Sequence, residues 1–434
     1  MKREEKIQKI ADYIRSGEKN IEDITIGMEI ENFVIDKNTL ETVSYYGKDG
    51  VGETLEYFMN KGYEPYKEGN YVLGLQKGDI SVSTEPGSQF EVAIKSNTDI
   101  ERLERKYISF FNELIEYLDK KSQNLVTLGY HPNKKIEDVK ILPKKRYDYM
   151  YDYFKTKGTM AHNMMKGTAS LQVTIDYLNE EDFRRKYFIA NMLTPILYGI
   201  FDNTYIFEKE PLETYTIRQK IWENTDKDRS GLFDIAFDKD LSYKKYAEKI
   251  IETPTIFIEK NGEYIYTKDK TFEEIIDEYG IDEGLIFHAL SIVFPDVRVK
   301  TYMEFRMFDE IPYPLNFSAV ALIKGLFYNE NNLKEMCKIG EGTTYEEALK
   351  GKEYIQKDGI NATYLGNTIL EHGKFLVELA SKGLDENERK YLEPLKELLK
   401  EGKTPREKFK EIYEKEGLEK AVESVTLKVE KSDV

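Results

Sequence analysis

Apolar and polar residues alternate along most of the chain in two different rhythms. Residues 3–16, 99–121 and 180–202 have apolar side chains at helical spacing, and each segment predicts one helix. Runs with strand-like alternation or short apolar blocks predict β-strands. These runs are residues 25–36, 80–86, 89–94, 169–176 and 297–309, the last as one long strand. The mixture predicts an α+β fold.

Turn residues connect some of these elements. The pair Pro86-Gly87 joins two of the predicted strands. The pair Asn261-Gly262, with alternating residues on both sides, predicts a β-hairpin over residues 255–267.

The remaining segments suggest how the chain is divided. Residues 40–80 predict a short helix and a hairpin, and residues 203–240 predict an ordered loop with short helices. From about residue 316 the pattern is almost wholly helical and highly charged, and no repeat or linker interrupts the chain. We expect a single domain, residues 1–434, with a sheet-forming core at 1–315 and a helical C-terminal region at 316–434.

Polar side chains gather on one face of four predicted strands, since successive residues of a strand point to opposite faces. The residues are Glu29 and Glu31, then Gln89 and Glu91, then Ser170, Gln172 and Thr174, and finally Arg298, Lys300, Tyr302, Glu304 and Arg306. A half-exposed sheet with its polar side in water would give the same alternation. However, Glu is depleted in strands, and like charges on one face repel each other. So many carboxylates, with Glu85 just before the turn, therefore indicate bound cations.

The types of residue in this cluster suggest which cations. Oxygen ligands without cysteine and with little histidine suit Mg²⁺ or Mn²⁺, not zinc. Two or three such ions would bridge the phosphates of ATP, and Arg306 beside Glu304 would supply a planar donor to a moving phosphoryl group. Arg298 and Lys300 share that face, where they would reach phosphate or form an ordinary buried ion pair. The pattern alone predicts a metal–phosphate site and leaves the reaction open.

Composition excludes several classes of protein. The 434 residues are 40% hydrophobic and 33% charged, which is enough apolar material for a large core and argues against disorder. The 80 acidic residues outnumber the 64 basic ones, giving a formal charge of −16, and no stretch is rich in bases alone. Nucleic acid is therefore a poor partner. An acidic chain still binds ATP where metal ions offset the charge.

Cysteine usage and the N-terminal sequence bear on location. Cys337 is the only cysteine, so no intrachain disulfide forms, which fits a reducing cytoplasm. The first residues lack an apolar signal region, and the apolar stretches are too short to span a bilayer. We therefore expect a cytoplasmic protein without membrane contact. The histidines have no ligand spacing, so we expect structural roles for His131, His162, His288 and His372.

Five segments resemble the glutamate–cysteine ligase family, closest to its plant-type branch. They are GMEIENF at 27–33, EPGSQFE at 85–91, TASLQVTID at 168–176, RQKIWENTDKDRSG at 218–231 and FPDVRVKTYMEFRMFD at 294–309. Their order and spacing follow the family over about residues 20–330, while the C-terminal third matches more loosely.

This resemblance implies a glutamine-synthetase-like fold, in which helices surround a curved antiparallel sheet that forms a funnel. It implies catalytic roles for Glu29, Glu304 and Arg306, and nucleotide binding by Arg298, Lys300 and Arg306. The implied metal ligands are Glu29, Glu31, Glu85, Glu91, Gln172 and Glu304. The implied substrate-binding residues are Arg218, Trp222, Asp226 and Arg229, with Arg218 or Arg229 gripping an α-carboxylate. An ion pair at the surface or between domains is the alternative for these arginines.

The activity implied by the resemblance is ATP-dependent formation of γ-glutamylcysteine from glutamate and cysteine, with Mg²⁺ or Mn²⁺, as the first step of glutathione or related thiol biosynthesis. We expect a monomer or a homodimer. Two alternatives stay open: the same chemistry with another amine acceptor, and a non-catalytic regulatory protein that binds nucleotide or metal. Two features depart from the plant-type pattern. Cys337 alone cannot form a redox switch of paired cysteines within this chain, and Ile30 stands where the motif commonly has a polar residue.

Overall fold

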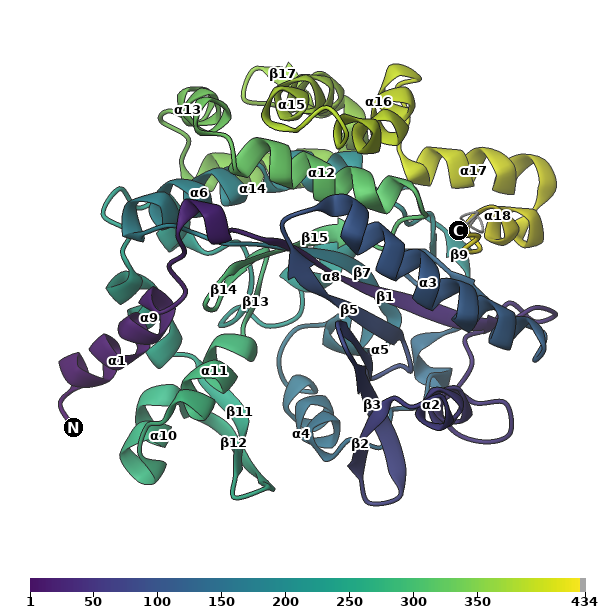
Figure 1. Ribbon diagram of the computed structural model, residues 1–434, viewed down its shortest axis with the longest axis horizontal. Coiled ribbons are helices and arrows are strands. Elements are labelled where there is room, and N and C mark those ends of the chain that lie inside the picture. Colours follow the sequence, from purple (N-terminus) through teal and green to yellow (C-terminus); the bar gives the residue numbers. More distant parts are fainter. Residues whose placement is uncertain (430–434) are drawn as a thin grey trace.

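A nine-stranded antiparallel β-sheet lies at the centre of the molecule (Figure 1). The computed structural model describes residues 1–429. The strands of the sheet are β1 (Ile26–Asp36), β2 (Glu64–Glu68), β3 (Tyr71–Lys77), β4 (Ile80–Thr84), β5 (Phe90–Asn97), β6 (Gln123–Val126), β7 (Ser170–Ile175), β14 (Val297–Val299) and β15 (Met303–Asp309). Their order is β14-β15-β7-β1-β5-β4-β3-β2, and β6 pairs with the far end of β1.

Four small hairpins or ladders lie outside this sheet. They pair β8 (Ile206–Phe207) with β9 (Glu210–Pro211), β10 (Ser230–Gly231) with β13 (Phe294–Pro295), β11 (Pro254–Lys260) with β12 (Glu263–Thr271), and β16 (Thr363–Tyr364) with β17 (Asn367–Thr368). The β11–β12 pair is the hairpin predicted over 255–267, which is confirmed.

Helices cover both sides of the sheet. Those of the first 315 residues are α1 (Arg3–Arg15), α2 (Val51–Asn60), α3 (Ile100–Asp119), α4 (Lys145–Phe154), α5 (Ala161–Gly167), α6 (Glu180–Met192), α7 (Thr194–Ile200), α8 (Ile217–Glu223), α9 (Tyr243–Ile251), α10 (Phe272–Tyr279) and α11 (Glu283–Ser291). Those that follow are α12 (Leu315–Phe327), α13 (Glu330–Ile339), α14 (Tyr345–Asp358), α15 (Ile369–Gly383), α16 (Glu393–Lys400), α17 (Pro405–Glu416) and α18 (Leu418–Ser424). None of the helices within residues 1–429 combines the length and apolar character needed to cross a membrane.

The helix α12 joins the sheet to the C-terminal helices. It contacts β1 and β7 on one side and α15 and α16 on the other (Figure 1). Because it lies between two layers, twelve of its thirteen residues are buried, from Leu315 to Phe327. Opposite it, α4, α11 and the β11–β12 hairpin face the other side of the sheet (Figure 1). The polar face of the strands is on the side of this second group, because residues of α4, α11 and β11 line the same cavity as Glu29 and Glu91.

Several predicted elements are confirmed, and one predicted helix is wrong in its continuity. The segments 3–16 and 99–121 form α1 and α3. The segment 180–202 forms α6 and α7, separated at Leu193, because Pro195 in the first turn of α7 has no N–H to continue the hydrogen bonds of α6. The C-terminal region is helical as predicted apart from β16 and β17, and residues 430–434 lie outside the described part of the chain.

The prediction of one long strand at 297–309 is wrong. The segment folds back on itself as β14 and β15, with a turn in which the Lys300 amide donates to the Tyr302 carbonyl at 2.8 Å. Arg298 is consequently opposite Glu304 on the neighbouring strand instead of preceding it along one strand. The sequence Lys-Thr-Tyr has none of the Gly, Pro, Asn or Asp residues that signal a turn, so the alternation continues across it.

Gly17, just after α1, allows the chain to approach this turn closely. A Cβ atom at position 17 would lie 2.1 Å from the backbone oxygen of Thr301. We expect Gly17→Ala to lower the free energy of unfolding by about 1–3 kcal/mol, because the neighbour is backbone and cannot rotate away. Urea denaturation monitored by circular dichroism measures the effect.

Gly284→Ala is the matched control, since the nearest atom to a Cβ there is Asp282 Oδ1 at 3.3 Å. Its position in the first turn of α11 favours alanine over glycine, so we expect an unchanged or slightly higher stability. Equal urea midpoints for Gly17→Ala and the parent protein would contradict the close approach at Thr301.

Candidate active site

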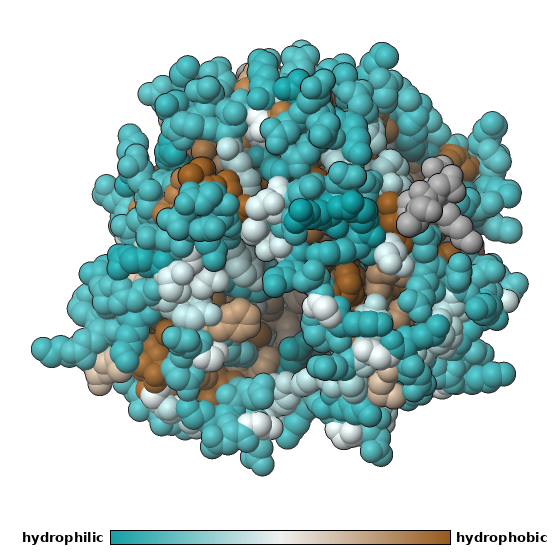
Figure 2. All heavy atoms as spheres, in the orientation of Figure 1, coloured by the Kyte–Doolittle hydropathy of each residue, from teal (hydrophilic) through white to brown (hydrophobic). Residues whose placement is uncertain are grey.

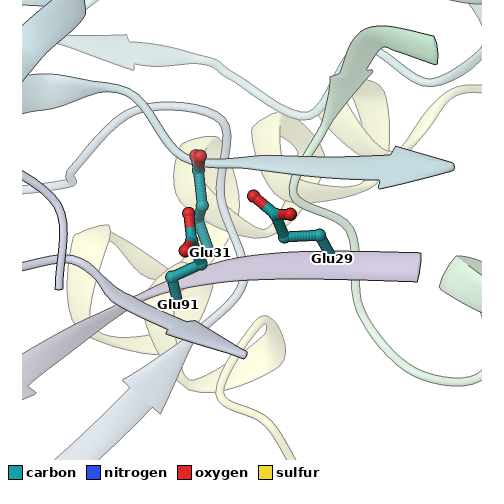
Figure 3. A group of neighbouring side chains, drawn as sticks. All are labelled: Glu29, Glu31 and Glu91. Atoms are coloured by element: carbon teal, nitrogen blue, oxygen red, sulfur yellow. The ribbon is translucent and has the colours of Figure 1, made fainter. Parts of the chain in front are cut away.

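Three glutamates from neighbouring strands form an acidic cluster on one face of the sheet (Figure 3). Glu29 and Glu31 are two residues apart on β1, so they point to the same side, and Glu91 is paired with Glu31 across the β1–β5 ladder. One carboxylate oxygen of each lies within 4.8 Å of those of the other two. On the opposite face, Met28 and Ile30 are buried in the core.

Side chains of the adjacent strands orient these carboxylates. The amide nitrogen of Gln172 on β7 donates to Glu31 at 3.1 Å and to Glu29 at 3.4 Å. The backbone amide and hydroxyl of Ser170 donate to Glu31 at 2.8 and 3.0 Å. The ladder fixes these contacts, because Glu29 and Gln172 are direct partners in the β1–β7 register.

The protein does not neutralise this cluster with bases in direct contact. Within residues 1–429, none of Glu29, Glu31 and Glu91 makes an ion pair with a lysine, arginine or histidine. Burial, together with the charge of Glu85, raises the pKa of Glu31 to about 7. Burial and the neighbouring acids also raise the pKa of Glu29 and, more strongly, that of Glu91. A group of buried oxygen donors with unbalanced negative charge fits Mg²⁺ or Mn²⁺.

Glu85 lies at the edge of the cluster, where β4 turns into β5. Its carboxylate accepts a hydrogen bond from the Tyr147 hydroxyl at 3.1 Å. The turn is fixed at Gly87, where a Cβ atom would lie 2.2 Å from the Lys166 carbonyl oxygen. The side chain of Gln89 also holds it, accepting from the Gly87 amide at 2.8 Å and donating to the Thr168 carbonyl at 2.8 Å.

Glu304 has a different environment from the other acids. Arg298 donates to both its oxygens, at 3.0 Å from Nη2 to Oε1, and Arg306 Nη1 lies 3.5 Å away. Although burial alone would raise the pKa of Glu304, these arginines and Lys300 hold it below its usual range. Of the two alternatives for Arg298, contact with phosphate or an ordinary buried ion pair, the structure shows the ion pair.

Lys300 lies beside this pair, and no carboxylate of residues 1–429 forms an ion pair with it. Within the same residues its ammonium group makes one hydrogen bond, to the Tyr302 hydroxyl at 3.3 Å. Burial and the positive charge of Arg298 lower its pKa to about 8. A buried ammonium group with spare donors is suited to bind an anion.

Arg306 reaches from β15 toward the acidic cluster. Its Nη1 donates to the Gln172 amide oxygen at 2.6 Å, and its guanidinium carbon lies 5.5 Å from the centre of the Trp222 ring. Arg218 lies 5.9 Å from the same ring and donates to the Arg306 carbonyl at 2.7 Å. Trp222 and Arg218 thus fix the strand and side chain of Arg306.

The other residues of the 218–231 segment lie behind the wall of the site. Arg229 is fully buried and donates to Asp226 at 2.7 Å, to the Ile292 carbonyl at 2.9 Å and to the Tyr153 hydroxyl at 3.1 Å. Its donors are directed at protein groups, and the Asp226–Arg229 pair is a buried ion pair that anchors the segment.

A cavity of about 360 Å³ opens above the acidic cluster. Figure 2 shows this face hollowed near its centre, with apolar surface on the side where Figure 1 has α11. The predicted site residues that line the cavity are Glu29, Glu31, Glu85, Glu91, Gln172, Trp222, Arg298, Lys300 and Arg306. Glu304 lies beneath its floor, and Arg218, Asp226 and Arg229 do not line it.

Sequence reasoning missed two parts of the wall. Arg146 and Tyr147 come from α4, and Phe287, His288 and Ser291 come from α11. The sequences of α4 and α11 do not indicate which of their residues face a cavity. Arg146 belongs to a basic run, LPKKRY, that resembles the start of a solvent-exposed helix. The predicted structural role of His288 agrees with its contact to the Phe257 carbonyl, 2.6 Å from Nε2.

Arg146 is the cationic group at the Glu85 end of the cavity. Its Nη2 donates to the Tyr147 hydroxyl at 3.2 Å, while its Nε is buried and has no hydrogen-bond partner among residues 1–429. Lys300, Arg298 and Arg306 are the basic side chains that line the cavity near Glu304. The cavity therefore combines a cluster of carboxylates with basic groups on more than one side.

Known proteins resemble this chain over most of its length. A model of "Glutamate-cysteine ligase family 2" matches residues 25–424. The chloroplastic glutamate–cysteine ligase of Brassica juncea is 29% identical over 416 residues, covering 92% of this chain and 80% of that protein. The corresponding protein of Arabidopsis thaliana is 28% identical over 419 residues, covering 92% and 78%.

A solved structure shares the fold. The glutamate–cysteine ligase of Francisella tularensis, determined in complex with AMP, superposes with a TM-score of 0.56 at 12% identity, over 93% of this chain and 87% of that chain. The predicted α+β, glutamine-synthetase-like fold is confirmed. Since the family model matches nearly the whole length, the protein belongs to glutamate–cysteine ligase family 2.

Proposed function

We propose that this protein is an ATP-dependent ligase that joins the γ-carboxylate of glutamate to the amine of cysteine. The observation that carries the proposal is the cluster of Glu29, Glu31 and Glu91, which lines a cavity together with Arg306 and has no ion pair with a basic residue of the described part of the chain. The chain also belongs to this ligase family. A cluster of carboxylates that needs cations, next to a fixed guanidinium, is the arrangement that phosphoryl transfer requires.

The cations in this proposal are two or three Mg²⁺ or Mn²⁺ ions. The residues that would hold them are Glu29, Glu31, Glu85 and Glu91, whose carboxylates line the cavity and are the donors such ions prefer. Gln172 and Glu304, which the resemblance also implies as ligands, accept hydrogen bonds from Arg306 and Arg298, so their oxygens would meet an ion only after these contacts open. When bound, the ions would balance the charge of the carboxylates and of the ATP phosphates.

Arg306 is proposed to stabilise the transferring group. Its guanidinium is held by Gln172 and Trp222, so little freedom is lost when it meets the phosphoryl oxygens. Lys300 is proposed to bind the phosphates of ATP, because its ammonium lines the cavity and has spare donors. Arg298 would act through Glu304, which it holds in the charged form.

Arg146 is proposed to bind the α-carboxylate of glutamate. Arg146 lines the cavity, and its Nε has no hydrogen-bond partner among the described residues. A guanidinium group with an unused donor is suited to bind a carboxylate. Among the predicted substrate-binding residues, Trp222 is proposed to contact substrate, because its ring lines the cavity. The other three, Arg218, Asp226 and Arg229, would hold the segment that carries Trp222 in place.

The proposed reaction proceeds in two steps. The γ-carboxylate of glutamate attacks the γ-phosphorus of ATP, and ADP leaves, giving an acyl phosphate. The amine of cysteine then attacks the acyl carbon, loses a proton and expels phosphate, which leaves an amide. The reaction requires that water be kept from the acyl phosphate, which it would otherwise hydrolyse.

The proposal also includes a location and an assembly. A cytoplasmic location is proposed from the single cysteine, whereas the plant relatives are named chloroplastic. A monomer or homodimer remains the prediction for the assembly.

ADP release tests the proposed function directly. With Mg-ATP and glutamate present, we expect release only when cysteine is added, and a product with the mass of γ-glutamylcysteine. Competition between cysteine and 2-aminobutyrate, which lacks the thiol, then measures how far the acceptor pocket recognises sulfur. Release with a different amine would identify another acceptor, and no release with any pair would favour a non-catalytic binding protein.

Substitution of the central residues tests their roles. We expect Arg306→Ala and Glu29→Gln each to lower kcat by about 10³-fold or more, because a preorganised charge opposite the transferring group is lost. Steady-state kinetics measure kcat, and circular dichroism checks the fold.

Arg185→Ala is the matched control for Arg306→Ala. Arg185 on α6 forms a two-point ion pair with Glu330 at 2.9 and 3.0 Å, away from the cavity. Its loss should leave kcat within about twofold, since an exposed pair contributes little. Undiminished turnover by Arg306→Ala would refute the assigned role.

A further inference from the structure

The helix α11 presents an aromatic ring to solvent at the edge of the cavity. Phe287 is 46% exposed, one of few large apolar side chains so exposed within residues 1–429, yet it also lines the cavity. Burial of this ring in the core would have been favourable, so its position leaves apolar area uncovered that a ligand can bury.

The ring lies directly beside Lys300, the residue proposed above to bind phosphate. The Lys300 ammonium is 5.3 Å from the centre of the Phe287 ring and 5.5 Å from that of Tyr302. Lys300 is the cation with spare donors here, whereas Arg298 is occupied by Glu304 and by the Ser291 carbonyl. A ligand whose phosphates meet Lys300 therefore has an aromatic surface within reach of its remaining part.

The helix holds the ring rigidly. Asp282 caps α11 by accepting from the Leu285 amide at 2.8 Å, and His288 Nε2 contacts the Phe257 carbonyl of β11 at 2.6 Å. Leu285, Ile286, Ala289 and Leu290 bury the other sides of the helix. A ring on a fixed helix loses little conformational freedom on stacking.

We infer that Phe287 is the stacking platform for the nucleobase of the nucleotide whose phosphates Lys300 binds. This inference rests on the proposed use of ATP and adds the place of its base. Stacking on a ring is tolerant of base identity, because every base has a π-face. The part of the cavity beside Arg146 and Glu85 is thereby left to the amino-acid substrates.

Ser291 extends the same surface by one helical turn. It stands four residues after Phe287, lines the cavity, and its hydroxyl has no hydrogen-bond partner among the described residues. The face of α11 toward the cavity thus combines an apolar ring with an unsatisfied polar group, as a nucleoside with its base and hydroxyls requires.

Direct binding measurements separate the base from the phosphates. Trp222 is the only tryptophan and lines the cavity, so its fluorescence can follow titrations of the whole protein with Mg-ADP and with Mg-tripolyphosphate, which has no base. We expect Phe287→Ala to weaken Mg-ADP binding by about fivefold to a hundredfold and leave tripolyphosphate binding unchanged. Phe287→Trp keeps a stacking surface, so its Mg-ADP affinity, measured by calorimetry, should stay close to that of the parent protein.

Two further variants act as controls. Lys300→Met should weaken both ligands, because it removes the phosphate contact that they share. Tyr354→Ala removes an aromatic residue of α14 that is 49% exposed and does not line the cavity, and should change neither affinity. Equal Mg-ADP affinities of Phe287→Ala and the parent protein would overturn the stacking inference while leaving the proposed function intact. Absence of Mg-ADP binding to the parent protein would overturn both.

Discussion

The site depends on three carboxylates that the sheet forces together. Glu29 and Glu31 cannot turn away from each other because they are two residues apart on β1, and the ladder brings Glu91 opposite Glu31. The rise of the Glu31 pKa from 4.5 to about 7 corresponds to about 3 kcal/mol at neutral pH. Full burial of one or two side chains such as Ile30, at about 1.5–3 kcal/mol each, offsets that amount. Burial of the apolar side chains on one face of β1 thus offsets the free-energy cost of the charged carboxylates on its other face.

The basic residues around this cluster are distributed unequally. Arg298 and Arg306 approach Glu304, which is therefore charged and fixed, while the three clustered glutamates have no such contact. Lys300 and Arg146 line the cavity and have donors that protein groups do not fill. A cavity that combines free carboxylates with basic side chains of this kind suits the proposed ligand, in which anionic groups would be shared between cations and basic side chains.

Local sequence was sufficient to predict the residues of the acidic cluster, but not the residues that form the walls of the cavity. The alternation in β1, β5 and β7 predicts that Glu29, Glu31, Glu91 and Gln172 share a face, because that depends only on the period of a strand. The fold-back at Lys300 was missed because no turn residue marks it, and the pairing of Arg298 with Glu304 depends on that fold-back. Arg146 and Phe287 reach the cavity from α4 and α11, and the direction in which such helices face is decided by tertiary packing.

The C-terminal helices contribute to the site through a chain of buried contacts. Lys352 on α14 is 1% exposed, and its ammonium donates to Asp296 at 2.5 Å and lies 3.2 Å from Glu223 at the end of α8. The backbone oxygen of Asp296 accepts from the Arg306 amide at 3.0 Å, where the β15 ladder is irregular. Removing one partner of a buried ion pair is costly, because the other charge is left uncompensated. The contacts of Lys352 with Asp296 and Glu223 therefore hold the strand of Arg306 and the helix of Trp222 in one arrangement. The helical region is therefore part of the framework that orients the guanidinium, which explains why α12 and α14 pack into the same core as the sheet.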